Sequence, residues 1–173
     1  METRLLTLAQ SAMKKTQDWL MGQTYDLRPV VILQRPDETL EQFTVDLGNY
    51  SDDKREGEVI RFQGLCREVK ATGAVTVETR WAVSPGVDRS TFLEELRKHR
   101  HIEKIPGYTE FLVITTFLPD RPGPALLCKV QRNELHEVTG FGALGRVNDP
   151  QKPILAPWST VPRPEGNHHD ALN

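Results

Sequence analysis

The sequence FLVITTFLPDRPGPALLCKV occupies residues 111–130 and contains two apolar stretches joined by a proline-rich connection. Residues 111–118 are apolar on both faces of an extended chain, the pattern of a strand that is covered on both sides. Pro119 to Pro124 form a rigid connection, after which residues 125–130 resume the apolar pattern. We therefore expect two strands here that pair antiparallel.

Upstream of this pair, two further regions have the patterns of strands. Residues 30–33 are apolar and mostly β-branched, and Pro36-Asp37 separates them from residues 43–45 by a sequence typical of a turn. A β-hairpin is the expected result. Residues 75–82 alternate apolar and polar side chains, which predicts a strand with one face in water.

The beginning of the chain predicts an amphipathic helix. Apolar side chains recur every three or four positions up to Leu20, and Gly22 follows where a left-handed cap would end a helix. We interpret its polar face as a solvated surface rather than a partner site; this face contains Lys14, Lys15, Gln17 and Asp18.

Two more helices are expected. Residues 51–73 have helical spacing of apolar side chains, with Ser51 as the N-cap and Gly73 as the stop. Residues 90–99 form a shorter helix, in which Thr91 and a glutamate three positions later have the spacing of a capping box.

These elements predict the fold class and the organisation of the chain. We expect an α/β (α+β) domain with a mixed sheet of about five strands flanked by helices. Residues 1–24 would form the N-terminal helix, and residues 25–146 the α/β domain. Residues 147–173 are rich in proline and poor in large apolar side chains, so they predict an extended tail without a core of its own.

Composition argues against several classes of protein. The 173 residues carry 22 Lys and Arg against 24 Asp and Glu, a net charge of −2, whereas general nucleic-acid binders usually have excess positive charge. No stretch approaches the ~18 uninterrupted apolar residues of a membrane span. Cys66 and Cys128 lie far apart in apolar stretches, so we expect reduced core residues in a cytoplasmic protein. No cofactor is predicted.

One short stretch matches a dinucleotide-binding motif in spacing only. Residues 140–145 read GFGALG, which is G-x-G-x-x-G. The motif requires a helix directly after it, whereas RVNDP follows here and is a poor start for a helix. We interpret the segment as a flexible glycine-rich turn or bulge.

A candidate metal site lies near the end of the third predicted helix. His99, His101 and Glu103 alternate, so on an extended segment all three would point the same way and could ligate one metal ion. On a helix they would spread apart, and the neighbouring cations would oppose binding of a dication. A solvated basic helix end is the alternative interpretation.

The same region and the tail also suggest a surface for a partner. The cations of residues 97–104 could bind phosphate, a nucleic acid or an acidic protein surface; they are Arg97, Lys98, Arg100 and Lys104. Trp158 could anchor the proline-rich tail on a partner. Residues 36–58 are strongly acidic, so the chain has separated charges of both signs.

Glu78 and Arg80 are further candidates, because they lie on the polar side of the predicted strand at residues 75–82. If they were buried they would have to pair, and a buried carboxylate beside a guanidinium could serve acid–base chemistry. We interpret them instead as a solvated pair of surface charges.

The order of the elements resembles that of small uncharacterised α/β proteins of bacterial and phage genomes. The similarity extends over roughly residues 28–146 and includes a helix ending CREV, a strand ending ETRW and the stretch TEFLVI. It implies a bacterial or phage origin and an α/β fold, and it carries no catalytic residue.

The leading functional hypothesis is a soluble, non-enzymatic protein that acts in macromolecular interaction or assembly, with another protein as its partner. One alternative is a metal-dependent hydrolase that uses His99, His101 and Glu103. Another is contact with phosphate or a nucleic acid through residues 97–104. No feature points to a membrane as partner.

Overall fold

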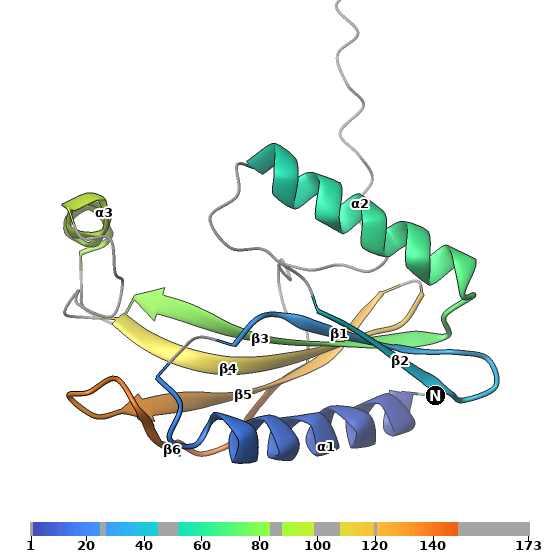
Figure 1. Ribbon diagram of the computed structural model, residues 1–173, viewed down its shortest axis with the longest axis horizontal. Helices are drawn as coiled ribbons and strands as arrows, with labels where there is room; N and C mark the ends of the chain where they lie inside the picture. Colours follow the sequence, from blue (N-terminus) through green and yellow to red (C-terminus); the bar gives the residue numbers. More distant parts are fainter. Residues whose placement is uncertain are drawn as a thin grey trace, which may run out of the picture.

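The chain forms a β-sheet with helices on both faces in a computed structural model, which describes residues 2–24, 27–44, 52–83, 88–98, 108–119 and 121–148 (Figure 1). The helices are α1 (Glu2–Leu20), α2 (Asp52–Glu68) and α3 (Arg89–Lys98). The strands are β1 (Val30–Gln34), β2 (Leu40–Thr44), β3 (Gly73–Val83), β4 (Tyr108–Phe117), β5 (Pro122–Arg132), β6 (Val138–Phe141) and β7 (Gly145–Val147). No helix within the described ranges is long and apolar enough to cross a membrane.

The strand order is β2-β1-β3-β4-β5-β6, with β7 also paired to β5. The antiparallel pair expected at residues 111–130 is confirmed as β4 and β5, in which Leu112 lies opposite Cys128. The expected hairpin is β1 and β2. As its turn chemistry predicts, Asp37 Oδ1 accepts a hydrogen bond from the Thr39 backbone N–H at 3.1 Å.

The sheet differs in two ways from the expected mixed sheet of about five strands. All pairs of neighbouring strands in the described sheet are antiparallel. The connection that contains α2 joins β2 and β3, which run in the same direction. These two strands are not neighbours, because β1 lies between them and is antiparallel to both. The sheet also has seven strands. The two extra ones, β6 and β7, include both ends of the glycine-rich segment 140–145, which is therefore not simply a turn or bulge.

The first hydrophobic layer lies between α1 and β3, β4 and β5. The buried side of α1 consists of Leu5, Ala9, Ala12, Met13 and Leu20. These side chains belong to one cluster with Leu112, Ile114, Leu126 and Cys128 of the sheet. The helix ends as predicted, because Gly22 has a φ of +76° and its N–H donates to the Val138 carbonyl oxygen at 2.9 Å.

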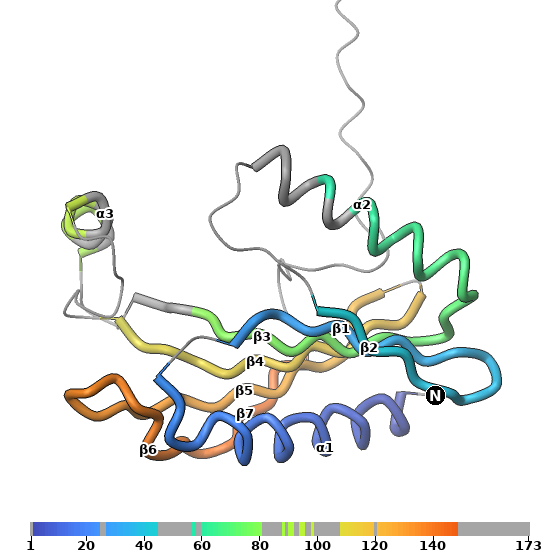
Figure 2. The backbone as a smooth tube through the Cα atoms, in the orientation of Figure 1, coloured from blue at the N-terminus to red at the C-terminus, as the bar shows by residue number. Residues whose placement is uncertain are grey.

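The second layer lies on the opposite face of the sheet, under α2 (Figure 2). Phe62 and Cys66 of α2 are buried in one cluster with Leu33 of β1, Ala74 of β3 and Phe117 of β4. Both cysteines are free and buried, as expected, with one in each layer.

α2 ends at Glu68, five residues before the predicted stop at Gly73. Lys70 takes the left-handed conformation at φ 51°, and the Ala71 N–H donates back to the Cys66 carbonyl oxygen at 2.9 Å. Gly73 instead begins β3 where the chain passes close to α1. A Cβ atom there would lie 2.7 Å from Leu5 Cδ2.

α3 begins one residue before the predicted start, because its cap is Asp88 rather than Thr91. Asp88 Oδ2 accepts a hydrogen bond from the Thr91 backbone N–H at 2.9 Å and from the Thr91 hydroxyl at 3.0 Å. Thr91 therefore contributes the backbone N–H that the N-cap residue Asp88 accepts from, and is not the N-cap itself.

Candidate functional site

α1 leaves part of its own face of the sheet uncovered. It packs over β3, β4 and β5, whereas the β1–β2 hairpin lies at the edge of the sheet beside it. Val30 pairs with Thr44 and Ile32 with Gln42, so these four side chains share the α1 face of the hairpin. Figure 2 shows the β1–β2 turn close to the beginning of α1.

α1 and the uncovered hairpin enclose a groove of about 770 Å³. Ala12, Lys15, Thr16 and Trp19 of α1 form one wall, Val30 and Ile32 of β1 with Val77 of β3 form the floor, and Gln42 and Thr44 of β2 form the other wall. Leu27 and Arg28, which precede β1, complete the lining. The floor is therefore apolar, and the walls supply polar groups.

The described residues that line the groove carry a net positive charge. Lys15 and Arg28 are exposed, and within the described residues neither has an ion-pair partner. The described residues that line this groove include no carboxylate. At the rim, Trp19 as a whole residue is 48% exposed, which is large for a tryptophan. An apolar floor with two cations and an exposed aromatic ring suits a ligand that has both apolar and acidic groups.

A second, separate hollow of about 330 Å³ lies nearer the start of α1. α1 and the β1–β2 hairpin line it, with Leu8 and Ser11 on α1, Gln34 at the end of β1 and Leu40 at the start of β2. Leu40 is exposed. At this end Arg4 of α1 forms an ion pair with Glu38 in the β1–β2 turn. Together the two hollows follow α1 from Arg4 to Trp19, and we call them the hairpin groove.

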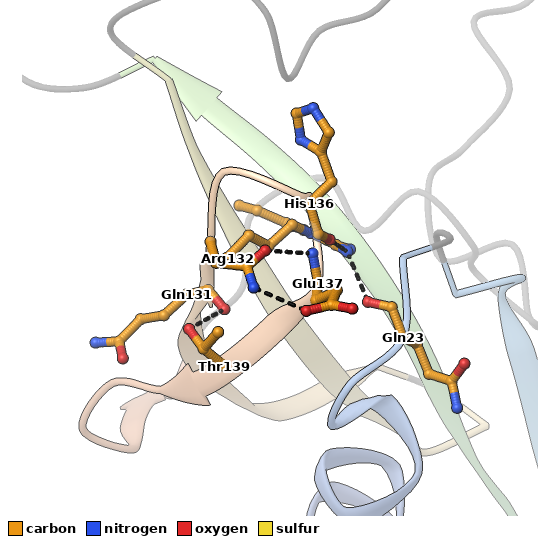
Figure 3. A network of polar contacts seen from close by, with 8 residues as sticks. Gln23, Gln131, Arg132, His136, Glu137 and Thr139 are labelled. Atoms are coloured by element: carbon orange, nitrogen blue, oxygen red, sulfur yellow. Dashed lines mark hydrogen bonds and ion pairs between the residues drawn. The ribbon is translucent and has the colours of Figure 1, made fainter.

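A polar network anchors the end of α1 that carries Trp19 (Figure 3). The Arg132 guanidinium of β5 binds the Glu110 carboxylate of β4 with two hydrogen bonds, of 2.6 and 2.9 Å. Its Nη1 atom donates to the Gln23 carbonyl oxygen at 3.3 Å and to the His136 carbonyl oxygen at 2.8 Å. The segment after α1 is thereby held to the sheet, which fixes one wall of the hairpin groove.

The predicted site residues lie almost entirely outside what the structure describes. Residues 99–107 and 149–173 are not in the described ranges, so His99, His101, Glu103, Arg100, Lys104 and Trp158 remain predictions. The side chain of Arg97 is likewise not described. Lys98 is exposed, and the 2.9 Å hydrogen bond it donates to Glu95 Oε1 raises the pKa of its ammonium group. Within the described residues no three His, Cys, Asp or Glu side chains form a group that could hold a metal ion.

Sequence patterns missed the hairpin groove. Lys15 was expected on a solvated helix face, and it is indeed exposed, but it also faces the hairpin across the groove. The available signal was the large apolar side chain of Trp19 near the end of α1, which lies off the buried stripe of the helix and is exposed. Such side chains, when they lie beside a groove, favour an interaction surface.

The interpretation of Glu78 and Arg80 as a solvated pair was wrong. The Glu78 residue is 1% exposed, and Thr76 on the same face of β3 is also buried, so this face is not in water. Arg80 Nε donates to Glu78 Oε1 at 2.9 Å. Burial raises the pKa of Glu78, and the Arg80 charge only partly opposes this. The pair lies on the α2 side of the sheet, opposite the hairpin groove.

Replacing Glu78 with glutamine should change how stability depends on pH. A carboxyl whose pKa is higher in the folded chain than in the unfolded one makes folding less favourable as pH rises between those two values. Glutamine does not titrate, so the stability of Glu78→Gln relative to the original chain should increase as pH rises above about 4.5. Urea unfolding at several pH values measures this difference.

Glu134→Gln is the matched control, because Glu134 is exposed. If the relative stability of Glu78→Gln stays flat or falls over the same pH range, the raised pKa of Glu78 is contradicted.

Comparison of the chain with protein-family models, with curated proteins and with solved structures gives no match. The resemblance to small bacterial and phage proteins therefore stays a prediction, and the hairpin groove is the feature of the described structure on which a function can be argued.

Proposed function

We propose that this protein is a non-enzymatic interaction protein that binds a segment of another protein in the hairpin groove. The observation that carries the proposal is the groove itself, an apolar sheet face beside a helix, bordered by an exposed tryptophan and two cations without carboxylate partners in the described structure. Tryptophan and arginine are enriched among the residues that supply most of the binding energy at protein interfaces.

The arrangement of the walls supports binding rather than catalysis. Lys15 and Arg28 are exposed and flank an open channel, whereas acid–base catalysis usually requires ionisable groups in an enclosed, partly desolvated site. An open channel along a helix gives a long, shallow contact. Contacts of this shape are typical of recognition of peptide segments.

Site-specific photo-cross-linking tests the proposal. The photoreactive residue p-benzoylphenylalanine is placed at Ser11, which lines the hairpin groove, or at Gln10, which is also exposed and polar but does not line it. The two positions are adjacent on α1, so they form a matched pair. Irradiation of cells that express each variant should give one discrete protein adduct from position 11 and none from position 10.

A second variant tests whether formation of the adduct requires the Trp19 side chain at the rim of the groove. Trp19→Ala in the position-11 variant should reduce the yield of the adduct at least tenfold while circular dichroism shows the fold unchanged. Equal adducts from both positions, no adduct from position 11, or an adduct that survives Trp19→Ala would each contradict the proposal.

The hydrolase and the phosphate or nucleic-acid alternatives depend on residues 97–104. Of this region the structure describes only residues 97 and 98, so these alternatives stay predictions.

A further inference from the structure

We infer that the segment bound in the hairpin groove is an acidic amphipathic α-helix that lies alongside α1, an inference that rests on the proposed function. Three properties of the groove support this inference: the hydrogen bonding of the backbone that lines it, its dimensions and its charge.

The backbone beneath a segment that lies on the groove floor offers it no hydrogen bonds. β1 forms the floor and is paired on one side with β2 and on the other with β3, from Val30 to Gln34 in both cases. One wall is α1, whose backbone groups bond within the helix. A segment lying on this floor must therefore satisfy its own backbone groups. A helix does so, whereas an extended peptide on the floor leaves its amides and carbonyls without partners. The outer edge of β2, at the end of the strand order, lies outside the floor.

The dimensions of the groove fit a helix. The uncovered face consists of β1 and β2, and neighbouring strands lie about 4.8 Å apart, so the strip is roughly 10 Å wide. A helix with its side chains has a diameter of about 10–12 Å. Along α1 the groove extends from Arg4 to Trp19, which at about 1.5 Å per residue is roughly 22 Å, or about four helical turns. One helix of about 15 residues would fill it.

The charge of the groove determines the composition of that helix. Val30 and Ile32 on the floor require apolar side chains at positions i, i+3, i+4 and i+7 of the bound helix. Lys15 and Arg28 stand at the edges of the wider hollow, where they would pair with Asp or Glu on the flanks of the apolar stripe. At the other end, Arg4 is already paired with Glu38. The acidic residues of the partner should therefore concentrate at the Trp19 end.

Selection from a library of random 16-residue peptides tests the inference with the full chain as bait. A parallel selection uses Lys15→Glu/Arg28→Glu, which reverses both groove cations. The matched control is Lys14→Glu, because Lys14 is an exposed lysine of the same helix that does not line the groove. The original chain and Lys14→Glu should enrich the same sequences, with apolar residues at helical spacing and a net negative charge.

The most enriched peptide is then synthesised with a fluorescent label for anisotropy and circular dichroism. We expect it to gain helical signal on binding and to bind Lys15→Glu/Arg28→Glu at least tenfold more weakly. Affinity for Lys14→Glu should change less than twofold. Enriched sequences with alternating apolar residues or net positive charge would overturn the inference, and so would the absence of any sequence that depends on Lys15 and Arg28.

The two experiments fail independently. A discrete adduct from position 11 together with no helical, acidic peptide from the library overturns the bound helix but leaves the hairpin groove as a binding site for a protein. Absence of any adduct from position 11 when Trp19 is intact overturns the proposed function itself.

Discussion

Replacing Arg132 with methionine is expected to lower the free energy of unfolding by about 3–5 kcal/mol, because the substitution leaves the Glu110 carboxylate buried without its partner. The two side chains are 12% and 3% exposed, respectively, so water cannot replace the lost hydrogen bonds. The change also removes the contacts from Arg132 to the carbonyl oxygens of Gln23 and His136. Urea unfolding followed by circular dichroism measures the loss.

The control for this prediction is Arg121→Met. Arg121 lies 3.4 Å from Glu2, and both side chains are largely exposed, so its loss should cost less than about 1 kcal/mol. The double variant Glu110→Leu/Arg132→Met removes both buried charges and should recover most of the lost stability. A change of less than 1 kcal/mol in Arg132→Met alone would show that this network does not hold α1 to the sheet.

Replacing Phe62 with alanine should also cost about 3–5 kcal/mol, through the lost burial of the ring and the cavity that it leaves. Phe62 is fully buried and packs edge-on against Phe43, with ring centroids 6.3 Å apart. Because Phe62 and Cys66 are the buried side chains of this layer among the described side chains of α2, we expect the helix to separate from the sheet more often. Urea unfolding measures the stability of the variant.

The two cysteines report which layer opens. Burial raises the pKa of the Cys66 thiol to about 11, so the folded chain should react slowly with iodoacetamide. In Phe62→Ala, alkylation of Cys66 should accelerate far more than alkylation of Cys128, which lies under α1. Ile60→Ala is the control on the same helix, because Ile60 is 47% exposed. Equal acceleration at both thiols would mean that the two layers open together, contrary to this prediction.

Much of the fold could be predicted because patterns among residues close together in the sequence indicate its strands and turns. The β4–β5 pair follows from two apolar stretches and a proline-rich connection, and the β1–β2 hairpin from the Pro36-Asp37 turn. The state of Glu78 could not be predicted in this way. Alternating polar residues have the same pattern whether their face of the strand lies in water or in a buried layer, and the interior of a sheet can bury Thr76 and Glu78.

The hairpin groove was not predictable for a different reason. It exists because α1 covers β3, β4 and β5 but not β1 and β2, and this depends on pairing between segments far apart in the chain. The residues around Lys15 in the sequence do not reveal whether its side chain faces open water or a neighbouring hairpin. The charge and metal-site hypotheses concerned residues 97–104 and Trp158, which remain predictions.

The pairing of α1 with late strands also affects how the chain is made. The Cys128 thiol of β5 lies 3.7 Å from the Met13 sulfur of α1, and the two residues are 115 positions apart. At translation rates of roughly 5–20 residues per second, α1 emerges on the order of ten seconds before β5 can cover it. Throughout that interval the nascent chain presents the apolar stripe of α1 to water or to a chaperone. Folding of the layer under α1 can therefore be completed only after β5 has been synthesised.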